Sequence, residues 1–258
     1  MRVLQRWIDR LARSFPAAAP PRAPDGLTIY AIGDVHGERV LLERLLDLLR
    51  RDAAERPEAP VAVFLGDYID RGPDSRGVLD LLCADPLPGF AVRRLLGNHE
   101  QAMLDFLEAP QSSGGWLDFG GIACLDSYGV RLQPGSRDAA RLTAWRDELR
   151  SRMPAAHVSL LRSLERWMVY GDYVFVHAGI RPGTPLAEQA LADLLWIREP
   201  FLNWTDPHEK VVVHGHSIRP APLRLPNRIG IDTGAYATGV LTAVALTGEE
   251  VRFLQVRR

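Results

Sequence analysis

The stretch Gly66-Asp67-Tyr68-Ile69-Asp70-Arg71-Gly72 lies between two similar ones, Gly33-Asp34-Val35-His36-Gly37 and Gly97-Asn98-His99-Glu100. Each follows a run of apolar, largely strand-forming residues, at 27–32, 61–65 and 91–96. This order places polar side chains at the carboxyl end of a buried strand, where open α/β sheets form their binding sites. The flanking glycines allow sharp turns and a close approach to an ion or a phosphate. Three such stretches predict an α/β fold with one shared site.

The composition is that of an ordinary globular protein. The 258 residues suffice for one large domain, and 47% of them are apolar and 24% charged. A formal net charge of −1 gives no reason to expect nucleic acid or a membrane surface as a partner. Cys83 and Cys124 cannot form a disulfide framework, and no run reaches the roughly 20 apolar residues of a transmembrane helix. We therefore expect a cytoplasmic protein, and we take it to be a monomer.

The first 24 residues are predicted to be separate from the rest. Within residues 1–15, five apolar side chains recur at helical spacing with arginines among them, and residues 16–24 resemble a stiff Pro/Ala-rich linker. A helix docked on the protein, or a frayed tail, is the favoured interpretation. Contact of residues 1–15 with an anionic membrane surface is the alternative. Residues 25–258 are then expected to form one domain.

The remaining chain is predicted to alternate between strands and helices. Helical stripes cover 41–51 and 78–82, and residues 101–168 are mainly helical, with loop material at 110–115, so that this region could cap the site. Strands resume at 173–176, 211–213, 229–231, 241–246 and 251–256. The last three are expected to form an antiparallel meander. The fold class is thus α/β with α+β character.

Two of the later strands also end in histidine, at His177 and His216. Five polar strand ends on one edge of the sheets favour a ligand role for both. His214 is interpreted as a strand-end residue or a neighbour of the ligands, and His157 and His208 as solvated. Asp232 is expected to fix a turn near the site.

The donor set fits two divalent ions, which together activate a water and polarise a phosphoryl oxygen. Asp67, on the central stretch, is the candidate bridging carboxylate. Asp34 and His36 can face one ion with it. The second ion would be completed by neutral donors, Asn98, His177 and His216, which leaves positive charge for a phosphate dianion.

The remaining polar residues suggest acid catalysis and phosphate binding. His99 directly follows a proposed ligand, so it is placed to protonate a leaving alkoxide, and Asp70 could orient its imidazole and raise its pKa. Arg71 presents a fork suited to phosphate oxygens, and Arg198 is a second candidate, with Asn98 within reach of the same phosphate. The expected reaction is direct attack on the phosphate by a hydroxide held between the ions.

The order of these motifs, continued by His-Ala-Gly at 177–179 and Gly-His-Ser at 215–217, resembles the phosphoprotein phosphatase family within the calcineurin-like metallophosphoesterases. The similarity covers roughly residues 27–258 and is greatest to the compact bacterial and phage serine/threonine phosphatases. It implies a four-layer αββα sandwich, a dinuclear centre of manganese, iron or zinc, and a phosphoprotein or phosphopeptide substrate. Mn²⁺ is the ion we expect to support activity in vitro.

The same resemblance implies the roles argued above. It assigns Asp34, His36 and Asp67 to one ion and Asp67, Asn98, His177 and His216 to the other. It also implies an acid pair of His99 and Asp70, with Arg71 as phosphate binder.

Two alternatives stay open. A symmetrical diadenosine tetraphosphate hydrolase would use the same metals, but that family tends to carry Leu-Val-Ala-Arg and Gly-Asn-His-Asp where this chain has Asp70 and Glu100. A non-catalytic binding module should have lost ligands or His99, and none is lost. Substrate choice is expected in the helical region, where a set of aromatic residues is either core or a substrate wall: Trp116, Phe119, Tyr128, Trp145 and Trp167.

Overall fold

The computed structural model describes residues 19–132, 135 and 137–258. Its first sheet has the strand order β10-β9-β1-β2-β3. The strands are β1 (Leu27–Ile32), β2 (Ala59–Phe64), β3 (Ala91–Arg94), β9 (Val240–Thr247) and β10 (Glu250–Arg257). β1, β2 and β3 are parallel, and a helical connection joins each to the next, as in βαβ units. β9 instead pairs antiparallel with both β1 and β10. The parallel part therefore brings the first three polar stretches to one sheet edge.

The second sheet has the order β4-β5-β6-β8-β7. Its strands are β4 (Trp167–Tyr170), β5 (Tyr173–Val176), β6 (Val211–His214), β7 (Leu223–Arg224) and β8 (Arg228–Gly230). β8 pairs parallel with β6, so the predicted meander of the last three strands is wrong. Only β9 and β10 form the expected hairpin, because residues 228–230 extend the second sheet instead of the first.

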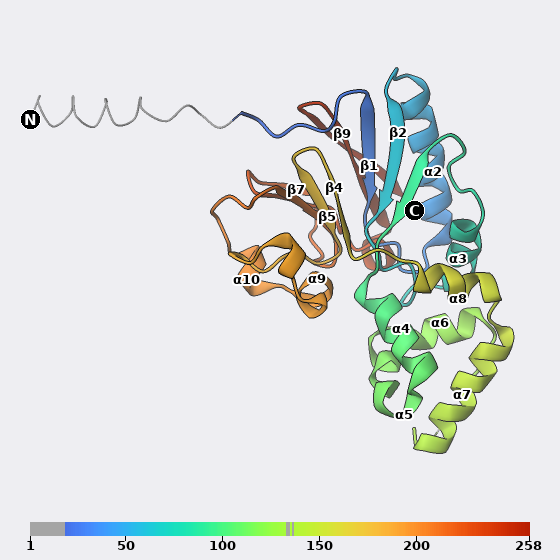
Figure 1. Ribbon diagram of the computed structural model, residues 1–258. Helices are drawn as coiled ribbons and strands as arrows, with labels where there is room; N and C mark the ends of the chain where they lie inside the picture. The colour runs from blue at the N-terminus through green and yellow to red at the C-terminus, as the bar shows by residue number, and fades with distance from the viewer. Residues whose placement is uncertain (1–18, 133–134, 136) are drawn as a thin grey trace, which may run out of the picture.

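The two sheets pack face to face between helices, which confirms the predicted four-layer arrangement (Figure 1). Ile29 and Ala31 of β1 face the second sheet, while Tyr30 and Ile32 face the helices on the other side, as the period of two in a strand requires. These helices include α2 (Arg39–Ala54) and α3 (Ser75–Cys83). On the outer face of the second sheet lie α9 (Leu191–Trp196) and α10 (Glu199–Leu202).

The helical region lies below the sheets in Figure 1. Its buried side chains belong to the same hydrophobic core as those between the first sheet and its helices. It consists of α4 (Asn98–Glu108), α5 (Pro110–Ser113), the 3₁₀ turn η1 (Gly114–Phe119), α6 (Gly121–Ser127), α7 (Ala139–Arg152) and α8 (Ala155–Arg162). The loop expected at 110–115 is wrong, because Pro110 begins α5, a position where its missing N–H costs nothing. Two short elements complete the fold, η2 (Leu186–Glu188) and α11 (Ala235–Thr238).

The helix predicted at 1–15 lies outside the described residues. Residues 19–24, the part of the predicted linker that the structure describes, lie against the rest of the protein. Ala23 is buried and donates its N–H to Gly248 O at 2.8 Å, while Arg22 donates its N–H to Asp172 Oδ2 and its carbonyl accepts the Asp172 N–H, each at 2.9 Å. No helix among the described residues is long and apolar enough to cross a membrane.

Candidate metal centre and acid pair

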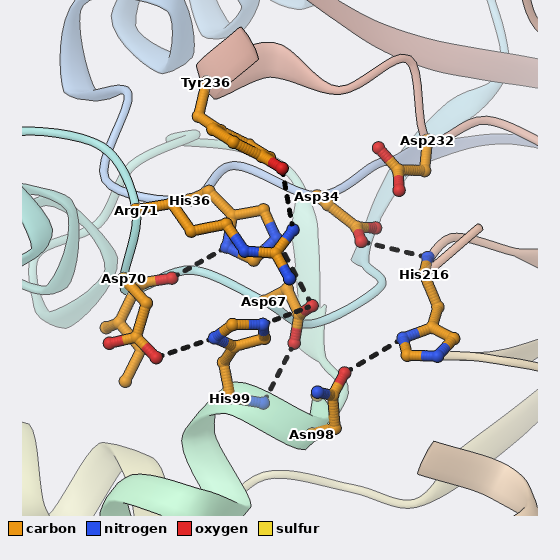
Figure 2. Close-up of polar contacts among 12 residues, drawn as sticks. Asp34, His36, Asp67, Asp70, Arg71, Asn98, His99, His216, Asp232 and Tyr236 are labelled. Atoms are coloured by element: carbon orange, nitrogen blue, oxygen red, sulfur yellow. Dashed lines mark hydrogen bonds and ion pairs between the residues drawn. The ribbon is translucent and has the colours of Figure 1, made fainter. Parts of the chain in front are cut away.

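Loops after five strands bring the predicted ligands together. Asp34 and His36 follow β1, and Asp67 follows β2. Asn98 opens α4 after β3, while His177 and His216 follow β5 and β6 of the other sheet. All six are buried, and Figure 2 shows Asp34, His36, Asn98 and His216 gathered around Asp67. We call these six residues the ligand cluster.

Asp67 is the centre of the ligand cluster. His36 Nε2 lies 3.4 Å from its Oδ2, and His177 Nε2 lies 3.4 Å from its Oδ1. The ligand atoms of His36, Asp67 and His99 all lie within 4.8 Å of one another, and so do those of Asp67, His177 and His216. One carboxylate thus belongs to two donor groups, which is the arrangement a bridging ligand requires.

The histidines are oriented as metal-bound histidines are. His36 Nδ1 donates to Ile69 O and His177 Nδ1 to Leu65 O, each at 2.9 Å. This second contact fixes the ring and directs Nε2 into the cluster. His216 Nε2 and Asp34 Oδ1 are buried without a hydrogen-bond partner among the described residues. Two divalent cations would satisfy these atoms, one at Asp34 and the other at His216, so the residues present fit the metals that the sequence predicts.

Electrostatics also favour a cation here. Burial, together with the negative charges of Asp232 and Asp67, raises the pKa of Asp34 well above its ordinary value. Burial opposes ionisation of Asp67 too, but the neighbouring imidazoles, led by His177, lower its pKa overall. Burial lowers the pKa of His36 to about 3 and that of His216 to about 2, so both are neutral donors. Neutral imidazole and ionised carboxylate are the forms that bind metal.

His99 and Asp70 form a buried pair beside this cluster (Figure 2). His99 Nδ1 lies 2.6 Å from Asp70 Oδ2, while its Nε2 points toward Asp67 Oδ2 at 3.9 Å. Burial lowers the pKa of His99, but the carboxylates of Asp67 and Asp70 outweigh it and raise that pKa overall. The imidazole is therefore oriented by one carboxylate and faces the cluster with its other nitrogen.

Trp116 also contacts Asp70, and this contact was not predicted from the sequence. Its indole Nε1 donates to the same Asp70 Oδ2 at 2.7 Å, and the side chain is 2% exposed. The sequence predicts Trp116 only as a core residue or part of a substrate wall. No local sequence signal marks it, because its partner lies in the preceding βα unit.

Arg71 and Arg198 lie on different sides of the site. Arg71 Nη1 donates to Tyr236 Oη at 3.3 Å and its guanidinium lies 4.9 Å from the centre of that ring (Figure 2). Tyr236 also meets His36 edge-on at 5.3 Å and was not predicted. Arg198 is exposed and donates to Ser217 Oγ at 3.3 Å, beside His216. Both guanidinium groups therefore border the ligand cluster.

The backbone is strained where the chemistry is proposed. Among the described residues, every non-glycine residue with positive φ is a predicted site residue: His36, Asp67, Asp70, Arg71 and His216. Side chains in this left-handed region cost of order 1–3 kcal/mol each and are typical of functional sites. Gly72 allows the loops to touch, since a Cβ there would lie 2.1 Å from His36 O.

Glu100 holds these loops together. Its carboxylate accepts the N–H groups of Asp67, Tyr68 and Gly97 at 2.8, 2.7 and 3.0 Å. This role of Glu100 was not predicted from the sequence. A glutamate at the third position of a helix is a capping signal that could have indicated the contact with Gly97.

The sequence also led to predictions for four residues outside the cluster. Asp232 accepts the Gly234 N–H at 2.8 Å, which confirms the predicted turn. His214 is buried, bonds to Gly215 O and belongs to neither donor group. His157 is not solvated as predicted: it is 1% exposed and bridges Tyr128 Oη and Asp80 Oδ1. His208 is half-buried and stacks on Phe201.

Comparison with known proteins agrees with this geometry. The family model described as calcineurin-like phosphoesterase matches residues 27–238. The chain belongs to this family. A symmetrical bis(5'-nucleosyl)-tetraphosphatase of Methylococcus capsulatus is 34% identical over 173 residues, 64% of this chain and 48% of that protein. Serine/threonine-protein phosphatase 1 of Salmonella typhimurium is 42% identical over 93 residues, 36% of this chain and 38% of that protein.

Solved structures share the fold. A crystal structure of a candidate diadenosine tetraphosphatase aligns with a TM-score of 0.61 over 93% of this chain and 96% of that chain, at 21% identity. The chain spans about half the length or less of the curated relatives named above. The family is therefore established, and the substrate has to be argued from the site.

Proposed function

We propose that this chain is a metal-dependent phosphoprotein phosphatase that hydrolyses phosphoserine and phosphothreonine, with phosphotyrosine as a further substrate to test. Two metal ions are expected, one held by Asp34, His36 and Asp67 and the other by Asp67, Asn98, His177 and His216. When bound, such ions activate water and polarise the phosphoryl oxygen. Manganese, iron and zinc all suit this nitrogen and oxygen donor set. A cytoplasmic, monomeric protein that binds no nucleic acid remains part of the proposal.

The pairing of Asp70 with His99 is the observation that carries the proposal. Serine and threonine are poor leaving groups, because their alkoxides are strongly basic and need a proton as the P–O bond breaks. His99 would supply that proton from Nε2 as an imidazolium, while Asp70 would accept the Nδ1–H, orient the ring and stabilise its positive charge. Arg71, Arg198 and Asn98 would bind the phosphate oxygens. An acid pair of this kind is most useful when the leaving group is an alkoxide.

The second candidate is a symmetrical dinucleoside tetraphosphatase, which the relative from Methylococcus capsulatus supports. That reaction expels a nucleoside diphosphate, a good leaving group that gains less from an acid pair. Asp70 and Glu100 stand where the hydrolase pattern has alanine and aspartate. This difference favours the phosphatase over the hydrolase.

The test compares a phosphoserine peptide with diadenosine tetraphosphate, using manganese-loaded enzyme and the variant Asp70→Asn. We expect a higher wild-type kcat/KM on the peptide and a loss in Asp70→Asn that is at least tenfold larger on the peptide. Asp147→Asn, at an exposed site on α7 in the helical region, is the matched control. A tenfold wild-type preference for the dinucleotide, about 1.4 kcal/mol of transition-state binding, would instead support the second candidate.

A further inference from the structure

One short segment of the helical region contacts three residues of the proposed chemistry. We call residues 116–120, the end of η1 and the glycine after it, the brace. Its Trp116 indole donates to Asp70 Oδ2, and the Phe119 ring meets His99 edge-on at 5.1 Å. Its backbone carbonyls at Phe119 and Gly120 accept from Arg71 Nε and N at 3.4 and 3.2 Å. The brace therefore touches both members of the acid pair and the phosphate-binding arginine.

The Trp116 side chain is held firmly in place. It is almost fully buried and packs on Phe106 with ring centres 5.1 Å apart. Its other neighbour is Gly121, where a Cβ would lie 2.6 Å from the ring. An indole enclosed in this way cannot turn to another partner without unpacking, so its N–H points at Asp70 permanently.

The carboxylate of Asp70 needs such a constraint. Its Oδ2 accepts both from His99 Nδ1 at 2.6 Å and from Trp116 Nε1 at 2.7 Å, whereas Oδ1 is buried without a partner among the described residues. The residue has a φ of +73°, and its own N–H donates to Ser75 Oγ at 2.9 Å. Without the indole, the carboxylate would depend on the imidazole alone to select which oxygen faces it.

We propose that Trp116 is a positioning residue, whose indole N–H fixes the Asp70 carboxylate against His99 and so sets how well His99 protonates the leaving group. This inference rests on the proposed function, since it assumes that His99 supplies the proton. It gives the helical region a part in the chemistry in addition to substrate choice. Removal of one hydrogen bond to a buried charged group should reduce the rate of an acid-assisted step by about 10- to 100-fold.

The experiment removes the N–H and preserves the shape. Trp116→Phe is the simple variant, and β-(3-benzothienyl)alanine at position 116 replaces only the N–H with sulfur, for use if the phenylalanine variant folds poorly. Trp145→Phe, another buried tryptophan of the helical region, is the matched control. Turnover is measured on a phosphoserine peptide and on p-nitrophenyl phosphate, whose leaving group needs little protonation.

We expect kcat on the peptide to fall by about 10- to 100-fold and kcat on the aryl phosphate to fall by less than threefold, with KM unchanged. Trp145→Phe should leave the ratio of the two rates as in the wild type. In an Asp70→Asn background, the change at position 116 should add nothing to the ratio. Equal losses on both substrates, or no loss in the benzothienyl variant, would overturn the inference.

His99→Asn, assayed on the same two substrates, separates this inference from the proposed function. A changed ratio in His99→Asn with an unchanged ratio in the Trp116 variants would refute the role of the indole alone. An unchanged ratio in His99→Asn would refute the acid role of His99, and the positioning role of Trp116 with it.

Discussion

Glu100→Gln is the substitution whose effect on folding follows most directly from the structure. One carboxylate oxygen, Oε2, accepts from Asp67 N and Gly97 N, and the other, Oε1, accepts from Tyr68 N and, at 3.3 Å, from Ile69 N. Because each of these partners is a donor, they favour the ionised carboxylate. Burial and the charge of Asp67 act in the opposite direction and raise the pKa of Glu100 to about 8.

The expected magnitude comes from counting donors. A glutamine retains one oxygen, so it can satisfy only one pair of N–H groups, and its own NH₂ is then directed at the other pair. A buried N–H left without an acceptor costs about 1–3 kcal/mol, so two such groups should lower the free energy of unfolding by about 2–6 kcal/mol. Asp67 is among the residues whose N–H would be affected, so metal retention should weaken as well.

Urea unfolding at about pH 9, where Glu100 with its pKa of about 8 is ionised in the folded protein, measures this loss, and added EDTA removes any contribution from metal binding. Glu108→Gln is the control, because Glu108 lies at the other end of the same helix, is 67% exposed and pairs with Arg162 at 3.6 Å on the surface. It should change the free energy of unfolding by less than about 0.5 kcal/mol. A Glu100→Gln variant as stable as this control would refute the idea that Glu100 holds the loops.

Three further predictions concern other parts of the chain. Asp67→Asn should abolish nearly all turnover and reduce bound manganese from two equivalents; full activity with two equivalents retained would contradict a bridging Asp67. Burial lowers the pKa of His157, so the unfolded state binds more protons below pH 6.5. Stability should therefore fall as pH falls through that range, by at most about 1.4 kcal/mol per pH unit, and His157→Gln should lack this component in urea titrations at several pH values. Deletion of residues 1–24 should lower the free energy of unfolding by about 1–3 kcal/mol more than deletion of residues 1–18, because it removes the hydrogen bonds of Arg22 and Ala23. Turnover of a small aryl phosphate should be unchanged in both deletions. A loss of turnover confined to the longer deletion would contradict this expectation.

The layers were expected from the resemblance to a known family, whereas the convergence of the proposed ligands follows from the sequence pattern itself. Apolar runs that end in Gly-Asp or Gly-Asn specify strands whose polar residues emerge at one sheet edge, and parallel pairing of β1, β2 and β3 then places Asp34, Asp67 and Asn98 together. Which of the two sheets contains β8 could not be predicted. A strand of three residues carries little pattern of its own, and its partner is chosen by tertiary packing against β6.

The missed residues share one property: their importance lies in a partner far along the chain. In the sequence, Trp116 looks like any aromatic core residue of the helical region. Only the structure shows that its N–H donates to Asp70. Tyr236 lies in the short helix α11, and its contact with Arg71 joins residues 165 positions apart. His157 was predicted to be solvated because it is polar. Its hydrogen bonds with Asp80 and Tyr128 instead allow it to be buried.

The strained loops of the site explain why so many of these long-range contacts converge there. A left-handed Asp67 or His36 persists only where its surroundings fix the backbone more strongly than the strain disfavours it. Here, the Asp67 carbonyl accepts from both Val35 N and His36 N, so the first two loops hold each other. Glu100 fixes the second loop from α4, and the brace fixes its far end at Asp70 and Arg71. Each support comes from a different element, so loosening any one should disturb the proposed ligands and the acid pair together rather than singly.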